Sequence, residues 1–365
     1  MLSFATACVP KIAAEGPEIH MPAIELAQMQ GPAITGDRYI TRDGLRLGLQ
    51  HWDAPNPFAI IVGVHGMSDY SNAFAMPAPW WGQHGISTYA YDQRGFGRSP
   101  QTGIWPGDDI LRRDLADFVE VIKARYPGLP VYVLGESMGG AVVMTAFASG
   151  NPPRADGVIL VAPAVWSQKT MPLSYRVALW TVSHTVRWMS LSGQGLKIVP
   201  SDNVPMLLAI GRDPLFQKRA RADAIYGLVS LMDEAYESPS RLPNLPLLVM
   251  YGGNDQIIPK RPTEQVIARF GPNATVKFYP KGYHMLLRDL DGGTRWSDIA
   301  VWIAQQAKTR APAQMMASDQ ASRMISAGAF IEGGSAFMNS AAQASRIPPA
   351  EAFSVGGSTP APLSP

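Results

Sequence analysis

Between residues 37 and 307 the chain alternates short apolar runs with longer amphipathic stretches. The runs lie at residues 58–64, 87–91, 131–134, 158–161, 247–251 and 275–279. The first of them, FAIIVGV, has no polar position that would suit a water-facing surface. Runs of this kind are typical of strands that are buried on both faces of a parallel sheet. The pattern therefore predicts a central sheet of mostly parallel strands.

The stretches between the runs have the periodicity of helices. In residues 108–126, one face collects Leu111, Leu115, Phe118, Val119 and Ile122, and the charged residues lie on the other. Further helices are expected at residues 138–149, 262–270 and 294–308. Near the beginning, residues 38–41 and 45–52 flank Asp43-Gly44, a dipeptide typical of hairpin turns. Together these patterns predict an α/β fold, with a doubly wound sheet that opens on an antiparallel hairpin.

One interval is too long for this scheme. Residues 164–243 separate two successive runs, and an ordinary crossover connection is much shorter. Because this interval is rich in helix-forming residues, tryptophan and methionine, we expect a helical cap inserted over the sheet. The core is then formed by residues 37–163 and 244–308. We expect an extended leader over residues 1–36 and a mostly disordered, Ala/Ser/Gly/Pro-rich tail over residues 309–365.

An apolar stripe runs along the first part of the expected cap. It is formed, at helical spacing, by Leu173, Val177, Trp180, His184 and Trp188. A stripe of this kind most often packs onto its own protein, and we favour that interpretation. The alternative is a surface that faces a lipid, since aromatic and Arg residues suit a bilayer interface.

A second stripe lies in residues 221–235, with apolar side chains at Ile225, Leu228, Val229 and Met232. It is expected to pack against the core, with one edge lining an acyl pocket. The candidate substrate-binding residues of the cap are His184, Trp180, Ile225 and Val229.

Charge and composition exclude several classes of function. Lys and Arg number 31 and Asp and Glu 29, so the net charge is +2 and there is no basic excess for nucleic acid. Apolar residues make up 46% of the chain, enough for a sizeable core. No apolar run approaches the ~18 residues of a membrane-spanning helix. Because Cys8 is the only cysteine, neither an intramolecular disulfide nor a cysteine metal cluster is expected.

The sequence around Cys8 leaves the localisation open. Ala5, Thr6 and Ala7 precede it and a polar stretch follows, which resembles the end of a bacterial lipoprotein signal. If the true start lies upstream, Cys8 would carry the lipid anchor of a cell-envelope protein. Otherwise a cytoplasmic protein is expected.

The candidate nucleophile is the serine of Gly135-Glu136-Ser137-Met138-Gly139. This pattern is weak by itself, but here it lies between an apolar strand, VYVLG, and a helical stretch, MGGAVVMTAFA. A turn this tight between a strand and a helix holds the central residue in a strained conformation and exposes its side chain above the sheet. The helix N-terminus beside Ser137 also favours developing negative charge.

A serine hydroxyl needs a base, and the histidine best placed to supply it is His284. It follows the last expected strand, at the sheet edge where Ser137 is exposed. Asp255, directly after the strand LLVMYG, is the carboxylate expected to orient His284, with Asp289 and Asp291 as alternatives. The order Ser137, Asp255, His284 is that of α/β-hydrolase triads.

The oxyanion of an acyl-transfer reaction needs hydrogen-bond donors. In this architecture they are main-chain N–H groups, here those of Met138 and, after the strand that ends near His65, Met67. His65 itself is expected to support the loop rather than to act as a base.

Five segments resemble the monoacylglycerol lipase and lysophospholipase group of serine hydrolases, which is similar to the serine aminopeptidases. They are HGMSDYS, YDQRGFGRS, GESMGG, GGNDQIIP and GYHMLLRD, in that order. The resemblance covers residues 37–307, including the cap. It implies the α/β-hydrolase fold, Ser137 as nucleophile, Asp255 and His284 as its partners, and Met67 and Met138 as oxyanion donors. One departure concerns the loop after His65, where the group typically has HGxGEHS and this chain has HGMSDYS.

The expected reaction is hydrolysis of a small-molecule or lipid ester through an acyl-enzyme, without a metal or an organic cofactor. Membrane association, peripheral or through a lipid anchor, is left open, and no protein partner can be inferred. An aminopeptidase, a C–C hydrolase or an acyltransferase would use the same triad, and a non-catalytic binding protein is a further alternative. A peptidase would need a carboxylate near the cap to hold a free amine. The candidates are Asp223, Asp233, Glu234 and Glu237.

Overall fold

The computed structural model describes residues 31–192 and 197–309. The expectations about Cys8, about most of the leader and about nearly all of the tail therefore lie outside the described residues. Among the residues that are described, no helix has both the length and the apolar character to cross a membrane.

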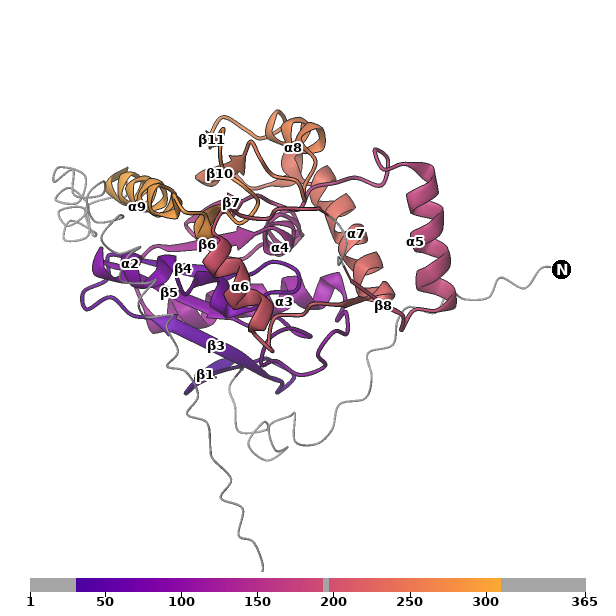
Figure 1. Cartoon of the computed structure of the whole chain (residues 1–365). Coiled ribbons are helices and arrows are strands. Elements are labelled where there is room, and N and C mark those ends of the chain that lie inside the picture. The colour runs from indigo at the N-terminus through magenta and orange to yellow at the C-terminus, as the bar shows by residue number, and fades with distance from the viewer. Residues whose placement is uncertain (1–30, 193–196, 310–365) are drawn as a thin grey trace, which may run out of the picture.

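A single twisted sheet forms the centre of the described part of the chain. Its nine strands lie in the order β1-β2-β3-β5-β4-β6-β7-β10-β11 (Figure 1). Their bounds are β1 Ala33–Thr35, β2 Arg38–Ile40, β3 Arg46–Trp52, β4 Ala59–Val64, β5 Ile86–Tyr91, β6 Val131–Glu136, β7 Gly157–Val161, β10 Leu247–Gly252 and β11 Ala274–Tyr279. The pairs β1–β2, β2–β3 and β3–β5 are antiparallel, and the remaining pairs are parallel. The predicted doubly wound sheet with an antiparallel hairpin is confirmed.

Helices cover both faces of the sheet (Figure 1). One face packs against α2 (Pro77–Gln83) and α9 (Gly292–Thr309), and the other against α3 (Asp108–Arg125), α4 (Met138–Phe147) and α8 (Lys260–Ile267). Strand β4 shows why its sequence has no polar position. Ile60 and Val62 join the core cluster of α3 and α4, while Ala59 and Ile61 join that of α2 and α9.

Two elements were not predicted from the pattern. Residues 33–35, expected in the leader, pair with β2 as an edge strand. Helix α2 has the sequence PAPWWGQ, whose prolines and glycine are poor helix formers. The helix forms because Pro77 is tolerated in the first turn and because Trp80 and Trp81 are buried. The indole N–H of Trp81 also donates to the carbonyl oxygen of Trp296 at 3.0 Å.

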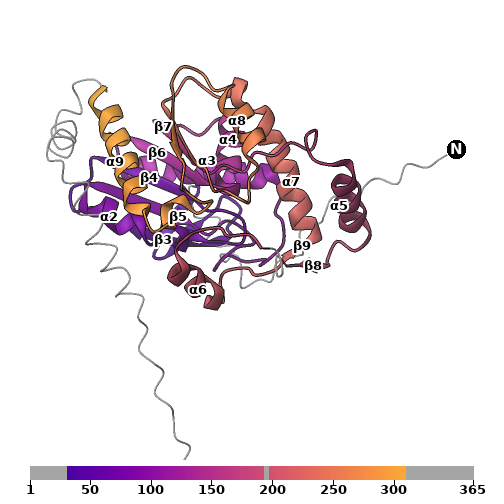
Figure 2. The ribbon, with the colours of Figure 1, turned by 45° about the horizontal axis from the view of Figure 1, so that its top comes forward.

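Between β7 and β10 the chain leaves the sheet and forms a cap. The cap contains α5 (Leu173–Thr185), α6 (Val204–Arg212), α7 (Ala222–Glu237), the short helix η2 (Pro239–Arg241) and the two-stranded ribbon of β8 (Ser190–Leu191) and β9 (Ala220–Arg221). Helix α7 packs on α4, and α5 packs on α7. Both views show α5 at the edge of the molecule, separated from the sheet by α7 (Figures 1 and 2).

We favoured packing of the apolar stripe of the cap onto the protein, and that interpretation is wrong, because the stripe is exposed. Leu173 is 68% exposed, Trp180 55% and Trp188 64%. The reason is that Leu173, Val177 and Trp180 border a hollow between α5 and α7 that no side chain of the described residues fills. Helical periodicity identifies an apolar face but not what covers it.

Candidate active site

Ser137 occupies a sharp turn between β6 and α4. Its backbone has φ 53° and ψ −117°, a region that non-glycine residues rarely adopt. Such strain persists only where the surroundings fix the residue. Here the N–H of Ser137 donates to the carbonyl oxygen of Val161 at 3.0 Å, and its own carbonyl oxygen accepts from the N–H of Ala164 at 2.9 Å. The turn therefore holds the hydroxyl above the carboxyl edge of the sheet.

The two glycines of the motif are required by close backbone contacts. A Cβ at Gly139 would lie 2.0 Å from the carbonyl oxygen of Val64, and one at Gly135 would lie 2.5 Å from the carbonyl oxygen of Gly139. No side chain fits at such distances. The helix can thus begin directly beside β4, and the N–H of Met138, in its first turn, has no acceptor within the helix.

His284 bridges Ser137 and Asp255. Its Nε2 lies 2.9 Å from the Oγ of Ser137, and its Nδ1 lies 2.8 Å from the Oδ2 of Asp255. A carboxylate only accepts, so Nδ1 carries the proton and donates to Asp255. Nε2 is then the lone-pair nitrogen that accepts from the serine hydroxyl. These are the contacts of a nucleophile, a base and an orienting acid.

The carboxylate of Asp255 is held on both of its oxygens. While Oδ2 accepts from His284, Oδ1 accepts from the main-chain N–H groups of Ile257 at 2.8 Å and Ile258 at 3.0 Å. The side chain is fully buried, and that of His284 is 6% exposed. The two alternatives are engaged elsewhere, since Asp289 accepts from Ser201 and Tyr283, and Asp291 pairs with Arg295.

The loop after β4 (residues 65–70, the β4 loop) passes directly over Ser137. A Cβ built at Gly66 would lie 3.2 Å from the Cβ of Ser137. Met67 lines the same cavity as Ser137, while Met138 is buried at the start of α4. Both residues predicted to supply oxyanion donors therefore lie near the serine, Met138 next to it in the chain and Met67 in the wall of the same cavity.

His65 ties the β4 loop to the loop after β5. Its Nδ1 donates to the carbonyl oxygen of Gly66 at 2.8 Å, and its Nε2 accepts from the N–H of Gln93 at 2.9 Å. Complete burial lowers the pKa of His65, which keeps the imidazole neutral. Both nitrogens are used, so His65 has no capacity left for proton transfer.

Sequence reasoning missed a buried ion cluster beneath the nucleophile. Arg288 places Nη1 2.7 Å from Asp69 and Nη2 3.2 Å from Glu136. All three residues are almost completely buried. Burial raises the pKa of Glu136, and the positive charge of Arg288 opposes that effect. The sequence contained two signals, Glu136 inside the Gly-x-Ser-x-Gly motif and Arg288 in GYHMLLRD. Their spacing in the sequence does not predict that they pair.

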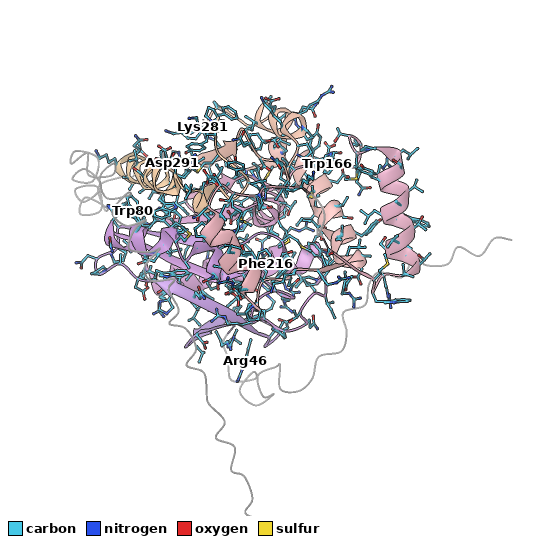
Figure 3. The ribbon with its side chains drawn as sticks, in the orientation of Figure 1. Arg46, Trp80, Trp166, Phe216, Lys281 and Asp291 are labelled. Carbon is cyan, nitrogen blue, oxygen red and sulfur yellow. The ribbon has the colours of Figure 1, made fainter. Side chains whose placement is uncertain are left out.

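An apolar cavity of about 490 Å³ opens beside Ser137 and His284. Its wall is formed by the β4 loop, by cap residues and by the segment after β10. The apolar side chains are Met67, Trp166, Met171, Phe216, Leu228, Val229, Met232, Ile257, Ile258 and Met285. Trp166 and Phe216 line it from separate segments of the cap and are labelled in Figure 3. Such a wall suits a hydrocarbon chain, and the reacting carbonyl would lie at its polar floor.

Of the cap residues proposed to bind substrate, only Val229 lines this cavity. Ile225 is half-buried on α7, and His184 is exposed on α5, where its ring stacks on Trp180 at 4.6 Å. Trp180 lines a smaller hollow of about 230 Å³ between α5 and α7. That hollow shares Met171 and Val229 with the catalytic cavity, so the two are neighbours.

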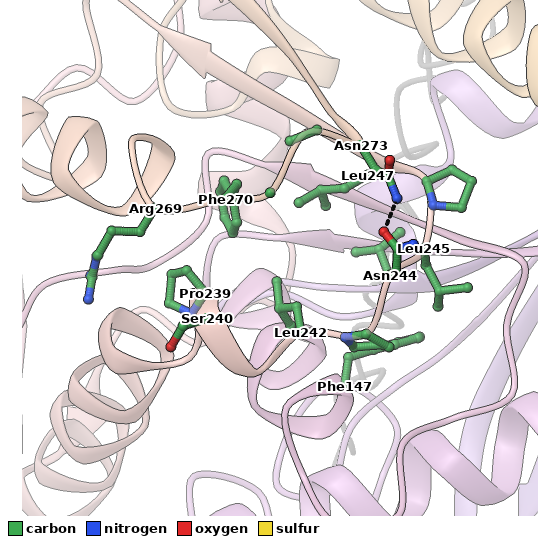
Figure 4. A pocket seen from close by; sticks show the side chains of 15 residues that line it. Phe147, Pro239, Ser240, Leu242, Asn244, Leu245, Leu247, Arg269, Phe270 and Asn273 are labelled. Atoms are coloured by element: carbon green, nitrogen blue, oxygen red, sulfur yellow. Dashed lines mark hydrogen bonds between the residues drawn. The ribbon is translucent and has the colours of Figure 1, made fainter.

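A further cavity of about 230 Å³ lies away from this chemistry. It is lined by residues near η2, β10 and the loop before β11, among them Leu242, Arg269 and Phe270 (Figure 4). Asn244 and Asn273 are joined by a hydrogen bond across one side of it. None of Ser137, Asp255 and His284 reaches it. In the described ranges, no group of three His, Cys, Asp or Glu side chains is arranged to hold a metal ion.

Known proteins resemble this chain over most of the described region. The model of the serine aminopeptidase S33 family matches residues 55–291. Human monoglyceride lipase is 26% identical over 277 residues, which cover 74% of this chain and 90% of that protein. The monoacylglycerol lipase of Mycolicibacterium smegmatis is 27% identical over 280 residues, 71% of this chain and 93% of that protein.

Solved structures resemble the fold. The crystal structure of the Paleococcus ferrophilus monoacylglycerol lipase matches with a TM-score of 0.61 at 22% identity, covering 71% of this chain and 99% of that one.

Proposed function

The chain belongs to the serine aminopeptidase S33 family, has the α/β-hydrolase fold and is a carboxylic ester hydrolase, and we propose that it cleaves single-chain acyl lipids through an acyl-enzyme on Ser137. The family and the ester hydrolysis predicted from the motifs are confirmed. The proposed role of Ser137 is supported above all by one observation, the hydrogen bonds of His284 to both Ser137 and Asp255.

The reaction uses only groups of this chain and water. His284 Nε2 takes the hydroxyl proton as Ser137 attacks the ester carbonyl, and Asp255 stabilises the imidazolium. The N–H groups of Met67 and Met138 bind the oxyanion where negative charge develops. His284 then protonates the leaving alcohol, and a water molecule repeats the sequence to release the acid.

The apolar cavity favours an acyl chain over a peptide. The carboxylates that an aminopeptidase would need are engaged elsewhere. Asp223 pairs with Arg221, Glu234 with Arg112 and Glu237 with Lys169, and Asp233 accepts hydrogen bonds from Ser167 and Gln168. None of the four lines the cavity. The names of the two relatives, a monoglyceride and a monoacylglycerol lipase, support the same substrate class for this chain.

Helix α5 and the turn after it are the proposed contact with an anionic lipid surface. Their exposed apolar side chains are Leu173, Tyr175, Val177, Trp180 and Trp188, which we call the α5 face. The chain around it is strongly basic, although the whole protein is nearly neutral. From residue 169 to 221 it carries eight basic residues, Lys169, Arg176, Arg187, Lys197, Arg212, Lys218, Arg219 and Arg221, against Asp202 and Asp213. Lys169 and Arg221 pair with Glu237 and Asp223 outside this range, so the excess comes from the other six. Apolar and aromatic side chains among basic ones are the features of a helix that lies on an anionic membrane.

A substrate panel tests this function. Monoacylglycerols of increasing chain length, diacylglycerol and aminoacyl anilides are compared by kcat/KM. We expect a monoacylglycerol to exceed every anilide by at least about 100-fold, because the site has an apolar wall and no free carboxylate for an amine. The reverse order would replace the lipase proposal with the aminopeptidase alternative.

A further inference from the structure

A short segment of the cap rests on the β4 loop. Residues 213–217 connect α6 to the segment before β9, and they make three hydrogen bonds to the core loops. The N–H of Gln217 donates to the carbonyl oxygen of Ser68 at 2.8 Å, and its side-chain Nε2 donates to the carbonyl oxygen of Gly95. The hydroxyl of Tyr70 donates to the carboxylate of Asp213 at 2.7 Å. The segment is therefore fixed to the loop that carries Met67.

The residue held by this segment is conformationally strained. Ser68 has φ 71°, in the left-handed region, where a residue with a side chain is disfavoured by about 1 kcal/mol. Its carbonyl oxygen is the acceptor of Gln217. Glycine adopts the same conformation without that cost.

The other end of the loop is held by the core. Asp69 is paired with buried Arg288. The N–H of Tyr70 donates a hydrogen bond to the Asp69 carboxylate at 2.9 Å. Ser68 thus lies between Asp69, which Arg288 holds in place, and Met67. In the proposed mechanism the N–H of Met67 binds the oxyanion. A change of φ at Ser68 rotates the Met67–Ser68 peptide group and displaces the loop, including the neighbouring Gly66–Met67 peptide group that carries the N–H of Met67.

We propose that Gln217 is a positioning residue that couples the cap to the oxyanion site. While residues 213–217 rest on the β4 loop, Gln217 keeps Ser68 left-handed and the N–H of Met67 in place. Phe216, next to it, forms part of the cavity wall (Figure 3), so the same segment contacts the acyl chain. Displacing residues 213–217 then slows the chemical step, in addition to changing the access of substrate to Ser137. This inference rests on the proposed function, since Met67 matters only as an oxyanion donor.

Steady-state kinetics on a short soluble ester, p-nitrophenyl acetate, test the coupling without lipid present. The variant Gln217→Pro combined with Tyr70→Phe removes all three hydrogen bonds, including the one from the main-chain N–H of residue 217 to Ser68, and leaves the triad intact. We expect kcat to fall at least about tenfold and KM to stay within about threefold of the wild-type value. Complete loss of one oxyanion donor lowers kcat about 10²–10³-fold, and displacement of Met67 should cause part of that loss. Gly211→Ala is the matched control, since its Cβ meets nothing within 4 Å, and it should leave both constants unchanged.

Rescue separates positioning from a general loss of structure. Adding Ser68→Gly should bring kcat back to within about threefold of the wild type, because glycine holds the conformation with less support. An unchanged kcat in the double variant, or a fall that Ser68→Gly does not restore, overturns the coupling. The proposed function fails separately, if the wild-type protein hydrolyses no ester at all.

Discussion

The guanidinium of Arg288 lies 2.7 Å from the carboxylate of Asp69 and joins the loop of His284 to the loop that passes over Ser137. Its other nitrogen contacts Glu136, the residue that precedes the nucleophile. Base, nucleophile and oxyanion loop are thus fixed to one buried cation. The geometry of the site depends on this cation as well as on the hydrogen bonds of the triad.

Replacing Arg288 by Met should be strongly destabilising. It leaves two buried carboxylates without a counterion, and breaking a buried pair in this way costs about 3–5 kcal/mol. The free energy of unfolding from urea denaturation measures the loss. Arg154→Met is the matched control, because Arg154 and Glu120 form an exposed pair, and should cost less than about 1 kcal/mol. Equal losses in the two variants would show that the cluster is not a stabilising element.

The chain-length preference should depend on Val229, which lies where the catalytic cavity meets the hollow under α5. Val229→Phe narrows this junction. We expect kcat/KM to fall at least about tenfold for long-chain monoacylglycerols and to change little for acetate esters. Ile225→Phe, on the same helix but outside the cavity, is the control. A loss that is equal for short and long chains would indicate that the acyl chain takes another path.

Binding to anionic vesicles should depend on the α5 face. Tyr175→Ser combined with Trp188→Ser removes two exposed aromatic side chains that line neither cavity. We expect vesicle affinity to fall about tenfold or more, and binding of the wild type to weaken with salt. Sedimentation with phosphatidylglycerol vesicles measures it. Phe278→Ser removes an aromatic side chain from β11 that is also more than half exposed, and it should have no effect. Binding that survives the double substitution would place the lipid contact elsewhere.

The sequence predicted what is local and periodic. The strand ends that carry Ser137, Asp255 and His284 follow from apolar runs and the Gly-x-Ser-x-Gly turn, since carboxyl ends of parallel strands meet at one edge. Helix α2 was missed because its stability comes from burial of Trp80 and Trp81 and not from helix propensity.

Contacts between distant segments that no motif marks could not be predicted from the sequence. The Arg288 cluster and the bond from Gln217 to Ser68 join residues whose spacing carries no signal. The exposed α5 face was misjudged because periodicity identifies an apolar side but not its partner. Trp180 and His184, predicted to bind substrate, lie on α5, where Trp180 lines the hollow beside the catalytic cavity.

Labelling with a fluorophosphonate, followed by peptide mapping, tests the central claim most directly. The account predicts one adduct per folded molecule, on Ser137, with loss of esterase activity in step with labelling. Ser137→Ala should take up no label and lose about 10⁶-fold in turnover, as expected for a residue that acts in a unit with its base. An adduct on another residue, or a Ser137→Ala protein within about tenfold of wild-type activity, would contradict the assignment.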